Sequence, residues 1–144
     1  MNLPLPNLSQ LNWVEERDLS DPSRPVASAT AVVGGDAGTG RIDFFTKWEP
    51  NSYCSFHKHT GDAVSVVLAG ELHVEELDGT RKVRSVGNYA FTPEGRVHWE
   101  SAGPEGAVLF FSLHSKDGGA FEHHSREGEV LSSITVAGML TQFM

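Results

Sequence analysis

The chain has few of the features that mark nucleic-acid-binding, membrane-spanning or disulfide-stabilised proteins. Cys54 is the single cysteine among 144 residues, so no disulfide can form within the chain. Lysine and arginine number 11 against 19 aspartates and glutamates. The resulting net charge of −8 argues against the basic surface that nucleic acids or anionic membranes require. No apolar run approaches the roughly 20 residues of a membrane-spanning helix. The composition therefore predicts neither a nucleic-acid nor a membrane partner.

The N-terminal residues also lack a basic segment followed by a long apolar one, which a secretory signal would need. We therefore expect a cytoplasmic protein. A hydrophobic content of 39% over 144 residues is enough to bury a substantial core, so we expect a single folded domain.

Short β-forming runs separated by turn residues fill most of the chain. Residues 63–69 are almost continuously apolar, Gly70 interrupts them, and residues 71–77 alternate more cleanly. Asp78-Gly79 follows as a hairpin turn signal. No segment before residue 115 has a helical period. The pattern predicts an all-β fold, in which short antiparallel strands form a sandwich or barrel.

The composition divides the chain into three parts. Residues 1–25 are rich in proline, asparagine and serine, and they predict an N-terminal arm that packs on the barrel or on a second subunit. Residues 26–120 predict the β-barrel domain. Residues 121–144 predict a C-terminal segment that packs on the barrel as a last strand, a short helix or a docking segment. We expect the arm to lie at a homodimer interface.

Three histidines form the most informative pattern in the sequence. His57 and His59 are two residues apart, and on a strand this spacing places both side chains on the same face. His98 comes later, directly after a turn that contains Pro93 and Gly95. Three imidazoles that converge inside a β-barrel would bind one divalent transition metal, so these residues predict a metal site.

The same segment resembles the first sequence motif of the cupin superfamily, G-x5-H-x-H-x3,4-E-x6-G. His57, His59 and Gly70 stand at its histidine and closing glycine positions. Asn51 replaces the opening glycine and also tolerates tight-turn backbone angles. Ala63 stands where the family has its glutamate.

The second cupin motif, G-x5-P-x-G-x2-H-x3-N, is matched at four of its positions. These are Gly87, Pro93, Gly95 and His98. Ala102 replaces the final asparagine. The resemblance spans about residues 40–115, and it implies a jelly-roll-like antiparallel cupin β-barrel.

The alanine at the glutamate position changes the metal shell that the resemblance implies. The expected ligands are three neutral imidazoles, with open positions for water, oxygen or substrate. Imidazole ligands suit several metals. We predict Fe(II), with zinc, nickel, copper and manganese as alternatives.

A three-histidine Fe(II) site is similar to that of the acetylacetone dioxygenase-like cupins. The resemblance therefore implies a mononuclear non-haem dioxygenase that uses O2 to cleave a small dicarbonyl or enolisable substrate. Two alternatives stay open. One is a module that binds a metal or ligand without turnover, and the other is a metal-dependent isomerase or lyase acting on a small acid or sugar derivative.

Two carboxylates near the histidines are further candidates. A bulge at Asp62 would turn this residue inward as a fourth metal ligand. The alternative is a turn aspartate that accepts backbone N–H groups. Glu100 shares the face of His98, which is two residues earlier, and we predict it as a catalytic base or as the partner of a metal-binding histidine. A position on the rim of the barrel is its alternative.

The remaining candidates have plainer interpretations. His73, His114, His123 and His124 are expected at the surface, because they lie among polar residues, at a strand end or in the polar tail. Cys54 is expected to be a small buried side chain without a redox role.

Overall fold

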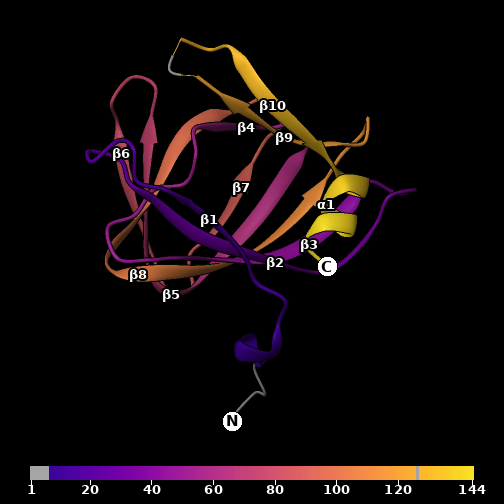
Figure 1. Ribbon diagram of the computed structural model, residues 1–144, viewed down its shortest axis with the longest axis horizontal. Coiled ribbons are helices and arrows are strands. Elements are labelled where there is room, and N and C mark those ends of the chain that lie inside the picture. Colours follow the sequence, from indigo (N-terminus) through magenta and orange to yellow (C-terminus); the bar gives the residue numbers. More distant parts are fainter. Residues whose placement is uncertain (1–6, 126) are drawn as a thin grey trace.

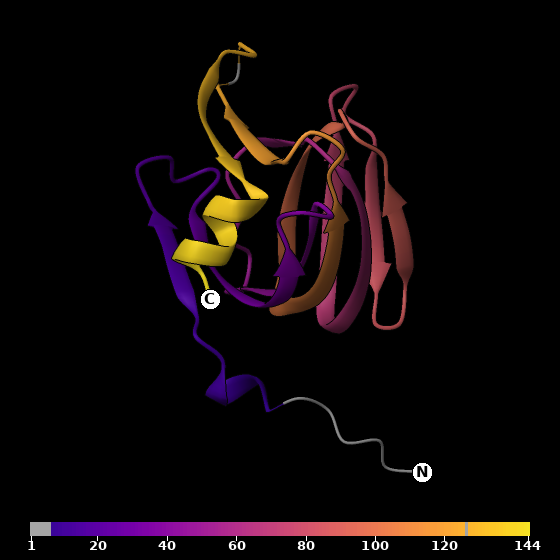
Figure 2. The ribbon, with the colours of Figure 1, turned by 90° about the vertical axis from the view of Figure 1, so that its right-hand side faces the viewer.

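The protein folds as one antiparallel sheet that curls around a core, with a short α-helix near the C-terminus (Figures 1 and 2). The computed structural model describes residues 7–125 and 127–144. The strands within these residues are β1 (Val14–Asp18), β2 (Val26–Asp36), β3 (Arg41–Trp48), β4 (His57–His59), β5 (Asp62–Glu76), β6 (Arg81–Ser85), β7 (Tyr89–Thr92), β8 (Val97–His114), β9 (Gly119–His124) and β10 (Val130–Thr135). The predicted all-β, antiparallel fold is confirmed.

The long strand β8 organises the sheet. It pairs with β5 along most of its length, with β3 over residues 107–114, and with β4 at its start. The sheet order is β1-β2-β3-β8-β4-β9-β10, and β5 connects β6 and β7 to β8. The short strand β4, which carries two of the three predicted histidine ligands, therefore lies between β8 and β9.

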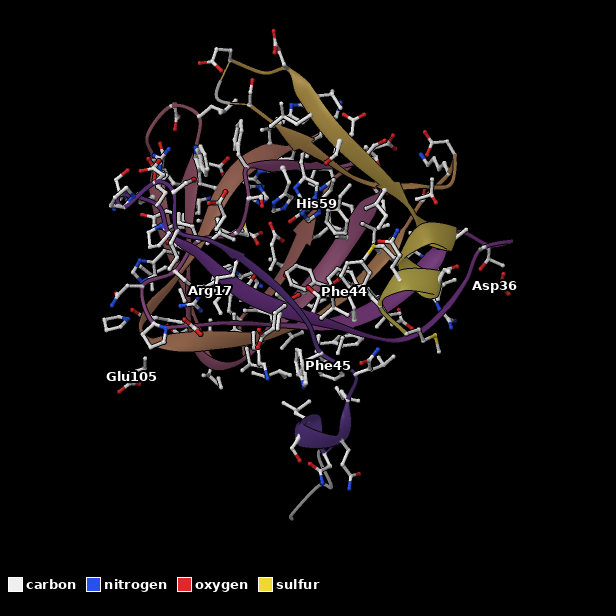
Figure 3. All side chains as sticks on the ribbon, viewed as in Figure 1. Arg17, Asp36, Phe44, Phe45, His59 and Glu105 are labelled. Atoms are coloured by element: carbon white, nitrogen blue, oxygen red, sulfur yellow. The ribbon has the colours of Figure 1, made fainter. Side chains whose placement is uncertain are left out.

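The core follows from the alternation of side chains along the strands. On β3, Phe44 points into the interior and stacks on Phe111 of β8, with ring centroids 5.1 Å apart. The next residue, Phe45, points to the opposite face and packs on Phe110 (Figure 3). Ile42 is fully buried. Burial of each such side chain contributes about 1.5–3 kcal/mol to folding.

Two residues of the first cupin motif have the backbone conformation that their positions require. Asn51 has φ 58° and Gly70 has φ 68°, both in the left-handed region. At Gly70 the neighbouring backbone also leaves no room for a side chain, because an added Cβ would lie 2.0 Å from the carbonyl oxygen of Gly106. The motif glycine is thus explained by close backbone packing within the barrel.

Both ends of the chain extend the sheet. Within the predicted arm, residues 7–13 include a 3-10 helix, Leu8–Gln10, and β1 pairs with β2 at the edge of the sheet. Residues 1–6 of the arm lie outside the described residues. The C-terminal segment contains both a strand and a helix: β10 pairs with β9, and α1 (Val136–Gln142) follows. None of the described helices is long and apolar enough to cross a membrane.

Candidate metal centre

Strand β4 places His57 and His59 side by side inside the sheet. The residue between them, Lys58, points the other way and pairs with Glu122 at 3.7 Å. The two imidazole rings are nearly parallel, with centroids 4.9 Å apart. Their Nε2 atoms face each other at 2.9 Å. The i, i+2 spacing therefore delivers two ring nitrogens to one point, as the sequence predicted.

Strand β8 brings the other two polar side chains of the cluster. His98 lies directly opposite His57 in the β4–β8 pairing, and Glu100 follows two residues later on the same face. Nε2 of His98 and Oε1 of Glu100 are 2.8 Å apart. One potential ligand atom from each of His57, His59, His98 and Glu100 lies within 4.8 Å of the others.

This donor set suits a divalent metal ion. All four side chains are buried, with exposed fractions of 8% for His57, 2% for His59, 2% for His98 and 5% for Glu100. The buried Nδ1 atoms of His59 and His98 have no hydrogen-bond partner among the described residues. Ring nitrogens that converge in a dry site, beside a carboxylate, are what a transition metal with nitrogen and oxygen ligands requires. These four residues would hold it.

Burial and mutual contact set the protonation of the cluster. Burial lowers the pKa of His57, and it lowers the pKa of His59 from 6.5 to about 3, so both rings are neutral at pH 7. Burial alone would raise the pKa of Glu100, but the hydrogen bond from His98 and its charge outweigh burial and lower the pKa to about 2. Glu100 is therefore an ionised carboxylate.

The protonation of His98 depends on the same contact. Burial acts to lower the pKa of His98, but the hydrogen bond to Glu100 and the charge of Glu100 outweigh it, and the pKa is raised. The two shifts favour a buried ion pair in the metal-free protein, with the proton on His98 and the negative charge on Glu100. A metal ion at the cluster would replace the proton that the two side chains share, because a metal-binding imidazole must be neutral.

The segment before β4 fixes the orientation of His57. Its Nδ1 lies 2.9 Å from the carbonyl oxygen of Ser55. This contact requires an N–H at Nδ1 and leaves the lone pair on Nε2, which points into the cluster. Cys54 lies nearby, with Sγ 3.6 Å from the same Nδ1. Burial and the charge of Glu100 raise the pKa of Cys54, so its thiol stays protonated beside the metal-free cluster. Cys54 is also not one of the four residues whose ligand atoms converge there.

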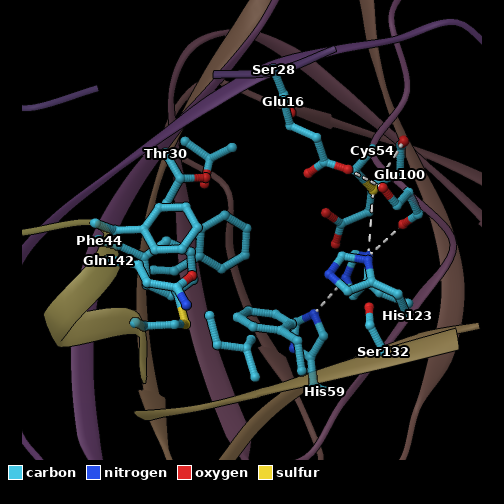
Figure 4. Close-up of a pocket in the computed structure, with 18 of the residues that line it drawn as sticks. Glu16, Ser28, Thr30, Phe44, Cys54, His59, Glu100, His123, Ser132 and Gln142 are labelled. Carbon is cyan, nitrogen blue, oxygen red and sulfur yellow. Dashed lines mark hydrogen bonds between the residues drawn. The ribbon is translucent and has the colours of Figure 1, made fainter. Parts of the chain in front are cut away.

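The cluster lies at one side of a cavity of about 370 Å³ (Figure 4). His57, His59 and Glu100 line it. An aromatic wall lines another part of it and consists of Phe44, Phe111 and Phe121. Phe121 also packs edge-on against the rings of His57 and His59, with centroids 5.6 and 5.1 Å away. A small molecule in this cavity would touch the cluster and an apolar surface at once.

The structure brings together the three predicted histidines but not Asp62. The strand is regular at this point, so Asp62 and Ala63 point to opposite faces. Oδ1 of Asp62 accepts a hydrogen bond from the backbone N–H of Glu94 at 2.9 Å, which agrees with the alternative of a backbone-capping aspartate. Glu100, expected as a base or histidine partner, lies within the cluster itself. The expected all-histidine shell is therefore incomplete: a carboxylate is present, but it comes from β8 and not from the motif position at Ala63.

One histidine of the cavity was missed from the sequence. His123 was expected at the surface, yet it is half-buried and lines the cavity. The reason is the pairing of β9 with β4, in which His123 lies opposite His57. The polar tail around His123 gave no signal for this, because the pairing is between distant parts of the chain.

A curled antiparallel sheet with a buried cluster of three histidines and one glutamate, contributed by β4 and β8, defines a cupin with a site suited to a divalent metal ion. Comparison with family models identifies one family among the cupins. The family model for the ChrR cupin-like domain matches residues 22–117, and the chain belongs to this family. No curated protein matches the sequence significantly.

Solved cupin structures share the fold at low sequence identity. An acetylacetone dioxygenase from Acinetobacter johnsonii is 15% identical, with a TM-score of 0.72, and the match covers 98% of this chain and 91% of that one. A candidate acetylacetone dioxygenase from Methylibium petroleiphilum is 11% identical, with a TM-score of 0.73 and coverage of 99% and 95%. An RmlC-like cupin from Ralstonia eutropha is 10% identical, with a TM-score of 0.73 and coverage of 99% and 85%. At these identities the likeness shows the fold alone.

Proposed function

We propose that the protein is a mononuclear non-haem iron dioxygenase that cleaves a small dicarbonyl or similar enolisable substrate with O2. The observation that carries this proposal is the buried cluster of His57, His59, His98 and Glu100 beside a cavity with an aromatic wall. The fold shared with an acetylacetone dioxygenase over nearly the whole chain adds support.

The charge of the cluster favours an enolate as ligand. His57 and His59 are neutral, His98 is neutral when it binds a metal, and Glu100 contributes one negative charge. Together with a divalent ion, the site would carry a net charge of +1. A buried charge of this kind is costly unless it is compensated, and one monoanionic chelating ligand would compensate it. An enolised dicarbonyl has this charge and two oxygens for chelation.

Each part of the site has a defined task. A bound iron ion would polarise the substrate oxygens and supply the redox chemistry. Ser55 holds His57 in the tautomer that presents Nε2. Phe44, Phe111 and Phe121 would pack on the carbon skeleton and exclude water from the reacting end of the cavity.

Metal analysis and oxygen consumption test the proposal. Protein from its natural source should contain iron, and apoprotein reconstituted anaerobically with Fe(II) should consume O2 with at least one member of a β-diketone panel. His59→Ala should lower the rate at least about 100-fold, because it removes a ligand. His73→Ala is the matched control, since His73 lies outside the cluster and contacts Glu71.

The results also separate the alternatives. Iron-loaded protein that consumes no O2 with any panel member would reject the dioxygenase. Tightly bound zinc or nickel in protein from the natural source, again without O2 consumption, would instead favour the module that binds a metal without turnover.

A further inference from the structure

Several polar side chains lie where the metal cavity meets a second cavity. The second cavity has a volume of about 530 Å³. Glu16, Ser55, His123 and Ser132 line both cavities, and we refer to these four residues as the neck. A molecule that reaches outward from the cluster would meet these side chains.

The neck is built mainly by segments outside the family match. Glu16 lies on β1, His123 on β9 and Ser132 on β10, whereas the family model covers residues 22–117. Ser132 and His123 are paired across the β9–β10 hairpin, so they share a face. The metal-binding side chains thus belong to the family's part of the chain, and the neck is a feature of its flanking segments.

The neck has hydrogen-bonding groups that are free to take a ligand. Oε1 of Glu16 accepts a hydrogen bond from the hydroxyl of Ser55, which holds the carboxylate at the cavity. No other hydrogen bond to this carboxylate, and none to the side chains of His123 or Ser132, occurs within residues 7–125 and 127–144. Figure 4 shows Glu16 extending into the cavity toward the side where Cys54 and Glu100 lie.

The charges at the cavity have one sign. Among the described residues that line the metal cavity there is no lysine or arginine, and the charged side chains are Glu16 and Glu100. Glu100 is committed to the cluster, so Glu16 is the charge that a ligand would meet at the outer end of this cavity. The second cavity adds two acidic side chains, Asp18 and Asp21, and one cation, Arg24, whose guanidinium group already pairs with Glu75 and lies over the ring of Trp99. A carboxylate beside Glu16 would be repelled, and a protonated amine would gain a charge-assisted hydrogen bond.

We propose that the neck recognises the end of the substrate that does not bind the metal, and that Glu16 selects a hydrogen-bond donor there, a primary ammonium above all, over a carboxylate. This inference rests on one part of the proposed function, namely that the cluster holds a metal and a chelating small molecule. It does not depend on the reaction with O2. It assigns the substrate a chelating end, a short apolar middle that fits the aromatic wall, and a donor at the far end.

Hydroxamates bound to zinc-loaded protein test the inference without oxygen chemistry. Three series of hydroxamates are compared by calorimetry at low ionic strength. In each series a chain of two to four methylene groups separates the hydroxamate from the far end, which is an ammonium, a methyl or a carboxylate group. At the best chain length, the ammonium ligand should bind about fivefold more tightly than the methyl ligand, and the carboxylate ligand about fivefold more weakly.

A pair of variants assigns the effect to Glu16. Glu16→Gln keeps an acceptor for Ser55 but removes the charge. In this variant the affinities for the ammonium and methyl ligands should differ by less than about twofold. Glu15→Gln is the matched control, because Glu15 is on the same strand with the same charge but does not line the metal cavity. It should keep the preference.

Three results would overturn the inference. They are equal affinity for the three end groups, a preference that survives in Glu16→Gln, and a preference lost equally in Glu15→Gln. Absence of O2 consumption with β-diketones would reject the dioxygenase and leave these binding results valid. Failure of the protein to bind zinc would overturn both proposals.

Discussion

At the scale of single residues, the position of the carboxylate is the main departure from the cupin motif. Ala63 has no ligand atom, yet the cluster contains a carboxylate because Glu100 lies two residues after His98 on β8. Alternation along the strand gives both side chains the same face. The carboxylate therefore reaches the cluster from the second motif region and not from the first.

Replacement of Glu100 should weaken metal binding. Glu100→Gln keeps the shape but removes the charge that offsets a divalent ion, so we expect the affinity for zinc to fall by about 10- to 100-fold. The measurement is a zinc titration against a competing chelator. Glu122→Gln is the control, because Glu122 contacts Lys58 on the outer side of β4. Equal affinities of Glu100→Gln and the wild type would remove Glu100 from the donor set.

At the scale of the elements, the barrel depends on close approach of β5 and β8 at Gly70. A side chain there would meet the carbonyl oxygen of Gly106 and would also require the left-handed backbone conformation. Gly87 has a similar φ of 86°, but nothing lies within 4 Å of the position of an added Cβ. A side chain at Gly87 would therefore meet backbone strain alone, whereas a side chain at Gly70 would meet both backbone strain and a steric clash.

Alanine substitutions should show this difference in stability. Gly87→Ala should cost about 1–2 kcal/mol in the free energy of unfolding, from backbone strain alone. Gly70→Ala should cost about 1–3 kcal/mol more, since the clash with β8 is added. Urea unfolding of both variants measures the difference. Equal losses would mean that β5 and β8 separate easily at this point.

At the scale of the whole molecule, the buried cluster makes stability depend on pH. His57 and His59 have a lower pKa in the folded protein than in the unfolded chain. Their contribution to stability is therefore present above pH 6.5 and is lost as the pH falls toward the folded-state values. His98 has a raised pKa, so its contribution is present below pH 6.5 and is lost as the pH rises through its folded-state value.

We therefore expect the metal-free protein to be most stable near pH 6.5. Below that pH, one to two extra protons bind on unfolding, and the free energy of unfolding should fall by about 1.4–2.7 kcal/mol per pH unit. Denaturant unfolding in chelator-treated buffer between pH 6.5 and 4.5 measures this slope. His59→Gln removes one of the two groups and should reduce the slope. An unchanged slope in this variant would contradict the assignment.

The ligand spacing and the fold could be predicted from the sequence because both depend on local patterns. The His-x-His spacing fixes a shared face on any strand, and turn residues at short intervals favour antiparallel strands. The role of Glu100 was foreseen only in part, since its face follows from alternation but its contact with His98 does not. The fourth-ligand role of Asp62 depended on a bulge at this residue, but β5 pairs with β8 in regular register there, and its register shifts lie further along the strand.

The sequence by itself determined the class of fold, the three histidines and the absence of a disulfide, because each follows from residue identity and spacing along the chain. The homodimer and the cytoplasmic location stay predictions. Only the tertiary structure decided which carboxylate joins the histidines, that His123 faces the cavity, and that Glu16 lies at its outer end. These depend on pairing between β1 and β2, β4 and β8, and β4 and β9. Such pairing is set by the packing of the entire sheet, which no local pattern encodes.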